Sequence, residues 1–228
     1  MRIYYIRHAQ SSNNALQWET DSRIGRHFDP ELTTIGRQQA EVLANFLLDN
    51  QDDFHIDVIY SSLMQRAVQT ALPLSRNLNL PLNGFLDMHE SGGVYLDDEE
   101  TNQPVGLPGF TPAELQAKYP ELILPENLNE TGWWNRPFET VSERVERAKR
   151  LISDLTSKHG DRNQVIALIS HQGFFNHFFF GLLHQERPPH FWFTLNNVSI
   201  TCLDITGEDM NAVYINRLSH LRDELATW

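Results

Sequence analysis

The chain has 228 residues, of which 40% are apolar and 21% are charged, so it can bury a sizeable core and is not disordered. Thirty acidic residues against 18 basic ones give a net charge of −12, which argues against nucleic acid and anionic membranes as partners. The single cysteine, Cys202, excludes an internal disulfide and a CxxC redox site. The chain starts without a signal-peptide pattern and lacks an apolar run long enough for a membrane span, so we expect a cytoplasmic protein.

Segments that predict strands alternate with segments that predict helices. In chain order, the pattern predicts a strand at 3–6, a helix at 33–48, a strand at 56–60, a helix at 63–78, a helix at 140–159, a strand at 164–169, a buried helix at 173–183, and strands at 198–203 and 212–216. This alternation predicts an α/β fold, a three-layer α/β/α sandwich with a mostly parallel central sheet.

The middle of the chain, residues 84–139, has a different composition. It carries eleven Asp or Glu residues against only Lys118 and Arg136, a net charge of −9, together with six prolines. We expect an inserted cap over the carboxyl ends of the strands, inside a single domain that spans residues 1–228. Capping boxes at 111–114 and 140–143 predict the starts of a short helix and of the next long helix. The inner face of that long helix is expected to hold Val141, Val145, Ala148, Ile152 and Leu155.

Three predicted strands end in polar residues that carry chemistry. The first leads into Arg7 and His8, the second into Ser61 and the nearby Arg66, and the third into His171. In a parallel sheet these ends meet at one edge. Two guanidinium groups match the oxygens of a tetrahedral oxyanion such as phosphate, and a neutral histidine among them can act as a nucleophile.

Five motifs in the correct order extend this pattern over nearly the whole chain. They are Arg7-His8-Ala9 with Ser11 and Asn14, the segment Leu32–Ala40, the segment Tyr60–Ala71, Glu90, and Ser170-His171. With these motifs the sequence resembles the histidine phosphatase superfamily, in its phosphoglycerate mutase-like branch. Two residues depart from the family pattern, because Ala9 and Gln172 stand where the family has glycine.

The resemblance implies a role for each of these side chains. His8 attacks phosphorus and becomes phosphohistidine, while Arg7, Arg66 and His171 hold the phosphoryl oxygens. Glu90 protonates the leaving alcohol and then takes a proton from water. Further substrate contacts are expected from the following side chains: Asn14, Ser11, Gln172 and Ser61. The resemblance implies no metal and no cofactor, and the expected partner is a small phosphorylated substrate.

The sequence leaves several alternatives open. Ser61 and Ser62 can serve mainly as helix caps, and Asp87 or His89 can replace Glu90 as the proton donor. Trp133 and Trp134, together with the aromatic segment 191–193, either line the substrate mouth or pack the cap. The assembly state is also open, with a homodimer as one alternative.

The acidic cap favours one reaction over its alternatives. A mutase needs extra basic residues in the cap to grip a substrate carboxylate, and only Lys118 and Arg136 are available there. We therefore expect a phosphomonoester hydrolase, a histidine acid phosphatase or phosphoglycerate mutase-like phosphatase. The alternatives are a cofactor-dependent phosphoglycerate mutase-type phosphotransferase and a catalytically weak module that binds phosphorylated ligands.

Overall fold

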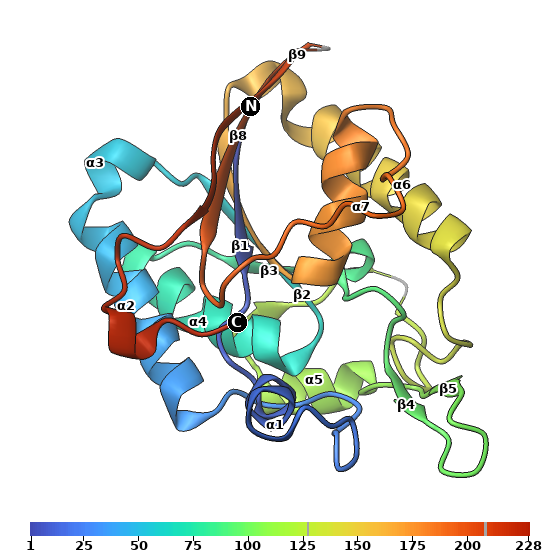
Figure 1. Ribbon diagram of the computed structural model, residues 1–228. Coiled ribbons are helices and arrows are strands. Elements are labelled where there is room, and N and C mark those ends of the chain that lie inside the picture. Colours follow the sequence, from blue (N-terminus) through green and yellow to red (C-terminus); the bar gives the residue numbers. More distant parts are fainter. Residues whose placement is uncertain (127, 208) are drawn as a thin grey trace.

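A seven-stranded sheet forms the centre of the computed structural model, which describes residues 1–126, 128–207 and 209–228 (Figure 1). In the order β6-β3-β2-β7-β1-β8-β9, the strands are β6 (Leu122–Ile123), β3 (Leu82–Phe85), β2 (Val58–Ser62), β7 (Val165–Ser170), β1 (Arg2–Arg7), β8 (Ile200–Thr206) and β9 (Asp209–Arg217). The first five strands of this order run parallel, and β8 and β9 add to one side in antiparallel fashion. The prediction of an α/β fold with a mostly parallel sheet is confirmed.

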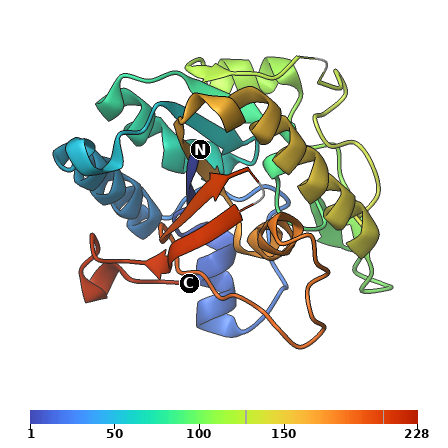
Figure 2. The same ribbon diagram turned by 90° about the horizontal axis from the view of Figure 1, so that it is seen from above.

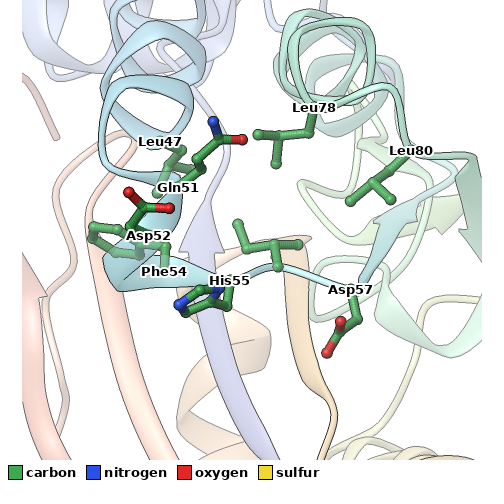
Figure 3. A pocket seen from close by; sticks show the side chains of 9 residues that line it. Leu47, Gln51, Asp52, Phe54, His55, Asp57, Leu78 and Leu80 are labelled. Atoms are coloured by element: carbon green, nitrogen blue, oxygen red, sulfur yellow. The ribbon is translucent and has the colours of Figure 1, made fainter.

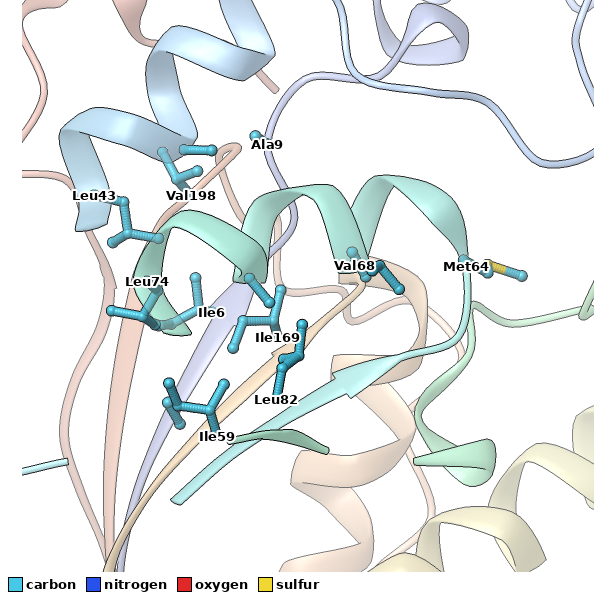
Figure 4. Close-up of a cluster of buried hydrophobic side chains, with 14 of the residues drawn as sticks. Ile6, Ala9, Leu43, Ile59, Met64, Val68, Leu74, Leu82, Ile169 and Val198 are labelled. Carbon is cyan, nitrogen blue, oxygen red and sulfur yellow. The ribbon is translucent and has the colours of Figure 1, made fainter. Parts of the chain in front are cut away.

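Helices cover both faces of this sheet (Figure 2). The described chain forms α1 (Ser12–Thr20), α2 (Thr34–Asp49), α3 (Gln51–Phe54), α4 (Gln65–Leu78), α5 (Pro112–Lys118), α6 (Val141–His159) and α7 (Gln172–Leu182). α2 and α4 pack on one face, and α6 and α7 pack on the other. Successive side chains of a strand point to opposite faces, so Ile3 and Tyr5 meet α6 and α7. Ile6 lies on the other face and meets α2 and α4 (Figure 4). The three layers follow from this double burial, which also explains the unbroken apolar run in β1.

Threonine side chains cap the starts of two of these helices, and the capping box predicted at 140–143 is confirmed. Thr33 accepts a hydrogen bond from the amide of Gly36 at the start of α2. Thr140 forms a capping box with Glu143 at the start of α6. These caps satisfy amide groups that the first turn of a helix leaves without partners.

The predicted inner face of α6 is partly wrong. Val141 is 61% exposed, and the fully buried face instead includes Arg147, Leu151 and Leu155 with Ala148. The prediction followed apolar side chains only, whereas the charge of Arg147 is compensated by the buried carboxylate of Glu139.

The region 84–139 contains the short helix predicted at 111–114 and also a hairpin that the sequence did not reveal. After β3, the chain forms a two-stranded hairpin of β4 (Tyr95–Asp97) and β5 (Pro104–Gly106). The elements α5 and β6 follow. The hairpin extends from the body of the protein at the end where α1 and α5 also lie (Figure 1). In the described part of the chain, none of the helices is both long and apolar enough to span a membrane.

Candidate active site

Three neighbouring strands end at the same edge of the sheet, and each delivers a predicted site residue. β1 leads into His8, β7 leads into His171, and β2 leads into α4, whose second residue is Arg66. Arg7 pairs with Ser170 across β1 and β7, and the His8 amide donates to the Ser170 carbonyl at 2.9 Å. The structure therefore brings together the groups that the sequence predicted to converge.

The hydrogen bonds of His8 define its tautomer. Its Nδ1 lies 2.7 Å from the carbonyl oxygen of Ala9, which can only accept a hydrogen bond. Its Nε2 lies 3.1 Å from Nε of Arg66, whose N–H can only donate. Both contacts fit a neutral imidazole with its hydrogen on Nδ1 and a lone pair on Nε2. This lone pair is the one that attack on phosphorus requires.

The surroundings of both histidines favour their neutral forms. Burial, together with the positive charges of Arg66 and Arg7, holds the pKa of His8 well below its ordinary value. Burial and the charge of Arg66 lower the pKa of His171 in the same way. The two rings lie 5.0 Å apart between centroids, so two neutral imidazoles share one site at neutral pH.

Asp29 faces a different nitrogen of the Arg66 guanidinium from the one that faces His8. Its carboxylate lies 3.9 Å from the guanidinium and accepts the Gln65 amide at 3.1 and 3.3 Å. Met64, at the cap position of α4, offers no side-chain hydrogen bond, so Asp29 takes over the capping of this helix. Burial raises the pKa of Asp29 to about 7, although Arg66 acts in the opposite direction.

Two buried nitrogen atoms beside His8 have no hydrogen-bond partner within the described residues. They are Nε of Arg7 and Nδ1 of His171, whose Nε2 lies 2.9 Å from the Ser62 hydroxyl. Another nitrogen of the Arg7 guanidinium donates to the Leu195 carbonyl. Burial lowers the pKa of Arg7 to about 10, so the group is still a cation at neutral pH. Because buried polar atoms are nearly always bonded, these two nitrogens indicate a place for an anion.

Glu90 lies against the N-terminus of α7, the helix that follows His171. Its Oε1 accepts the amides of Ser91 at 2.7 Å and Phe174 at 2.8 Å, and its Oε2 accepts the Gly173 amide at 3.2 Å. Gly173 permits this approach, since a Cβ atom there would lie 2.4 Å from Oε1. The positive end of the helix therefore holds an acid beside the second histidine.

The two alternative proton donors are engaged elsewhere. The carboxylate of Asp87 pairs with Arg150 at 3.2 Å on the outer side of α6. His89 is fully buried, and its ring packs against Trp134 with 4.6 Å between centroids. Among these three neighbours in sequence, Glu90 is the one that reaches α7.

The remaining predicted binding residues are mostly bonded within the protein. Asn14 and Ser11 form a capping box at the start of α1, which uses the oxygen of Asn14 but not its amino group. The buried hydroxyl of Ser61 donates to the carbonyl of the next residue at 2.9 Å. The side-chain oxygen of Gln172 accepts the Leu195 amide at 2.9 Å. Substrate contacts by these four residues stay predictions.

The two departures from the family pattern do not obstruct the site. The methyl group of Ala9 is fully buried in the core between α2, α4 and the sheet, and the Ala9 amide donates to the Thr70 hydroxyl at 2.9 Å. The side-chain oxygen of Gln172 also accepts a hydrogen bond from the Arg7 guanidinium at 3.4 Å, a contact between α7 and Arg7 that glycine could not make. Trp133 and Trp134 are only 3% and 4% exposed, and they pack the interior of the 84–139 region rather than the substrate mouth.

Two cavities show where small molecules can approach. One of about 500 Å³ is lined by Arg7, Asn14 and Gln172, together with the indoles of Trp18 and Trp228, which contact each other. Another, of about 270 Å³, lies among residues of α2, α3 and the loop before β2 (Figure 3). It contains none of the predicted site residues, because it lies where β2 begins and not where it ends.

Sequence reasoning missed two residues that support the site. Asp29 was not singled out, because its burial becomes visible only in the fold. Asn197 is fully buried and donates from its side chain to the His8 carbonyl at 2.9 Å. Only the fold brings Asn197, in the loop before β8, to the first strand. No group of three metal-binding side chains was found among the described residues.

Comparison with known proteins decides the family. The sequence matches the histidine phosphatase superfamily (branch 1) over residues 3–217. The chain belongs to this superfamily. As a member of the histidine phosphatases it is a phosphatase.

Individual histidine phosphatases and solved structures resemble the chain over almost its full length. A putative phosphoserine phosphatase 2 from Hydrogenobacter thermophilus is 28% identical, with 97% of this chain and 98% of the relative covered. Structures of Entamoeba histolytica phosphoserine phosphatase, a mutant with phosphoserine and a complex with 3-phosphoglyceric acid, have TM-scores of 0.61 and 0.62 at 21% and 22% identity. Each covers 97% of this chain and 99% of its own. A putative α-ribazole-5′-P phosphatase from Escherichia coli has a TM-score of 0.64 at 21% identity, covering 95% and 97%. These structural likenesses confirm the fold.

Proposed function

We propose that the chain hydrolyses small phosphomonoesters through a phosphohistidine formed on His8. The observation that carries the proposal is the bonding of this residue. The Ala9 carbonyl holds the hydrogen on Nδ1, and Nε2 keeps its lone pair next to Arg66. A neutral imidazole between two cations can attack a phosphate without repelling it.

The reaction has two steps that balance in protons and bonds. In the first, Nε2 of His8 forms a bond to phosphorus while the bond to the leaving oxygen breaks, and Glu90 gives that oxygen a proton. In the second, water attacks phosphorus, Glu90 accepts the proton of the water, and the P–N bond breaks. Glu90 suits both steps because it lies next to His171 at the N-terminus of α7.

The cationic and neutral donors stabilise the phosphoryl group during transfer. Arg7 and Arg66 supply charge to its oxygens, and the unpartnered Nδ1 of His171 and Nε of Arg7 supply further hydrogen bonds. The amino group of Asn14, on the wall of the 500 Å³ cavity, adds another donor.

Phosphoserine is the first substrate to test, since the relatives described above include phosphoserine phosphatases. Hydrolysis is favoured over mutase chemistry, because both basic residues of the 84–139 region are engaged. Lys118 pairs with Glu31 at 2.5 Å, and Arg136 stacks on Trp134 at 4.0 Å. Neither is available to grip a second acidic group of the substrate.

A substrate panel tests the proposal. Purified protein is given p-nitrophenyl phosphate, phosphoserine and 3-phosphoglycerate, with the His8→Ala variant as the control. We expect phosphate release by the wild type and none by the variant. Mutase turnover of 3-phosphoglycerate above its hydrolysis would favour the phosphotransferase, and binding of phosphorylated ligands without turnover would favour a recognition module.

A further inference from the structure

Hydrogen bonds from buried side chains hold the segment that carries Glu90. Only a short 3₁₀ turn, Leu86–Met88, precedes it, and no regular secondary structure follows until β4. Even so, the carbonyls of Asp87 and His89 accept hydrogen bonds from Arg147 at 2.7 and 3.0 Å. The Met88 carbonyl between them accepts the Ser170 hydroxyl at 2.8 Å. Side chains thus replace the missing secondary structure and fix this backbone in one conformation.

Arg147 and Glu139 form one buried unit around this segment. Two nitrogens of Arg147 donate to the Glu139 carboxylate at 2.6 and 2.8 Å, and the arginine side chain is fully buried. Beyond Glu90, the Gly92 amide donates to Glu139 Oε2 at 3.3 Å, and the Gly92 carbonyl accepts the Glu139 amide at 3.2 Å. The pair therefore contacts the backbone on both sides of Glu90.

The same arginine also contacts the helix that receives the Glu90 carboxylate. Its guanidinium carbon lies 4.0 Å from the ring centre of Phe174. The Phe174 amide donates to Oε1 of Glu90 at 2.8 Å. Arg147 thus connects both ends of the interaction, namely the segment that carries the acid and the residue that binds it.

A buried ion pair is poor evidence for a contribution to stability alone, because well-packed apolar residues often stabilise a core equally well. Its directional hydrogen bonds, in contrast, can hold an irregular segment in register. We propose that Arg147 and Glu139 are positioning residues that hold Glu90 in place as the proton donor. The inference rests on the proposed function, and it assigns a task to the charged residue on the inner face of α6.

The test is a double-mutant cycle with two aryl phosphates. The paired variant R147M/E139Q removes both charges together, so that neither is left buried alone. It is compared with Glu90→Gln and with the triple variant, using phenyl phosphate and p-nitrophenyl phosphate. The second leaving group is the weaker base and depends less on a proton. Arg150→Ala is the control, since the exposed side chain of Arg150 lies on the same helix but pairs with the carboxylate of Asp87.

If the pair acts through Glu90, R147M/E139Q loses about 10- to 100-fold in kcat on phenyl phosphate and less than about threefold on p-nitrophenyl phosphate. The triple variant then loses no more than Glu90→Gln does, and Arg150→Ala matches the wild type. Equal losses on both substrates, or additive losses in the triple variant, overturn the inference while the proposed function stands. A wild type that hydrolyses neither substrate overturns the proposed function itself. If circular dichroism shows that R147M/E139Q is unfolded, Glu139→Gln alone is judged by the same criteria.

Discussion

Gly173→Ala is the substitution that perturbs Glu90 most selectively. The new Cβ atom would lie 2.4 Å from Oε1 of Glu90 and 2.9 Å from its carboxyl carbon. The clash falls on the end of a flexible side chain, so the carboxylate moves and the backbone stays. Alanine is also the better helix former by up to about 1 kcal/mol, and we expect no loss of stability.

The size of the effect follows from this displacement. To regain an ordinary contact the carboxylate must withdraw by about 1 Å, which weakens its bonds to the Gly173 and Phe174 amides. A misplacement of about 1 Å can cost about 100-fold, and general acid catalysis contributes about 10²- to 10⁴-fold in all. We expect kcat on phosphoserine to fall about 30- to 100-fold, or about 2–3 kcal/mol in the barrier.

The assay compares phosphoserine with p-nitrophenyl phosphate under identical conditions. The second substrate should lose less than about threefold, because its leaving group departs without a proton. Gly181→Ala is the matched control in the same helix, where a Cβ would meet the flexible end of Ile152 at 3.0 Å. Undiminished phosphoserine turnover in Gly173→Ala, or a parallel loss on both substrates, would refute the placement of Glu90 as proton donor.

Three further predictions concern titration. Because burial, Arg66 and Arg7 hold the pKa of His8 well below its ordinary value, ¹⁵N NMR at pH 6.5 should show the neutral Nδ1–H tautomer, and an imidazolium signal at that pH would contradict this. Burial raises the pKa of Asp29 to about 7, so the contribution of Asp29 to stability is lost as the pH rises from about 4 to 7. Over this range, the free energy of unfolding of Asp29→Asn, measured by chemical denaturation, should rise relative to that of the wild type by about 1.4 kcal/mol per pH unit. A difference in unfolding free energy that stays constant with pH would be evidence against this. Burial and Arg144 lower the pKa of His177 to about 4, so the contribution of His177 to stability is lost as the pH falls from about 6.5 to 4. In His177→Gln, the free energy of unfolding should fall less steeply over this range, by up to about 1.4 kcal/mol per pH unit. The same slope as in the wild type would count against the assignment.

The sequence predicted the parts of the fold that have strong local signals. β1 is an unbroken apolar run, α2 begins at a capping threonine, and the strand ends carry Arg7-His8 and Ser170-His171. These features depend on neighbours in sequence, so periodicity and capping rules apply to them directly.

The features that the sequence did not reveal depend on contacts between distant residues. Arg147 lies at helical spacing from Leu151 and Leu155, but its burial depends on Glu139 as a partner, and an apolar pattern does not count it. The support of His8 by Asn197 likewise requires the late strands to return beside β1. A single domain with a cap at residues 84–139, a cytoplasmic location and a homodimer stay predictions.

Trapping the phosphorylated enzyme tests the central claim most directly. Protein mixed with p-nitrophenyl phosphate is quenched in alkali within the first turnovers, digested and analysed by mass spectrometry, with His8→Ala in parallel. We expect one acid-labile phosphoryl group on the peptide that contains His8, and none in the variant. Rapid hydrolysis by the wild type with no phosphorylated His8, or with the label on another residue, would contradict the account.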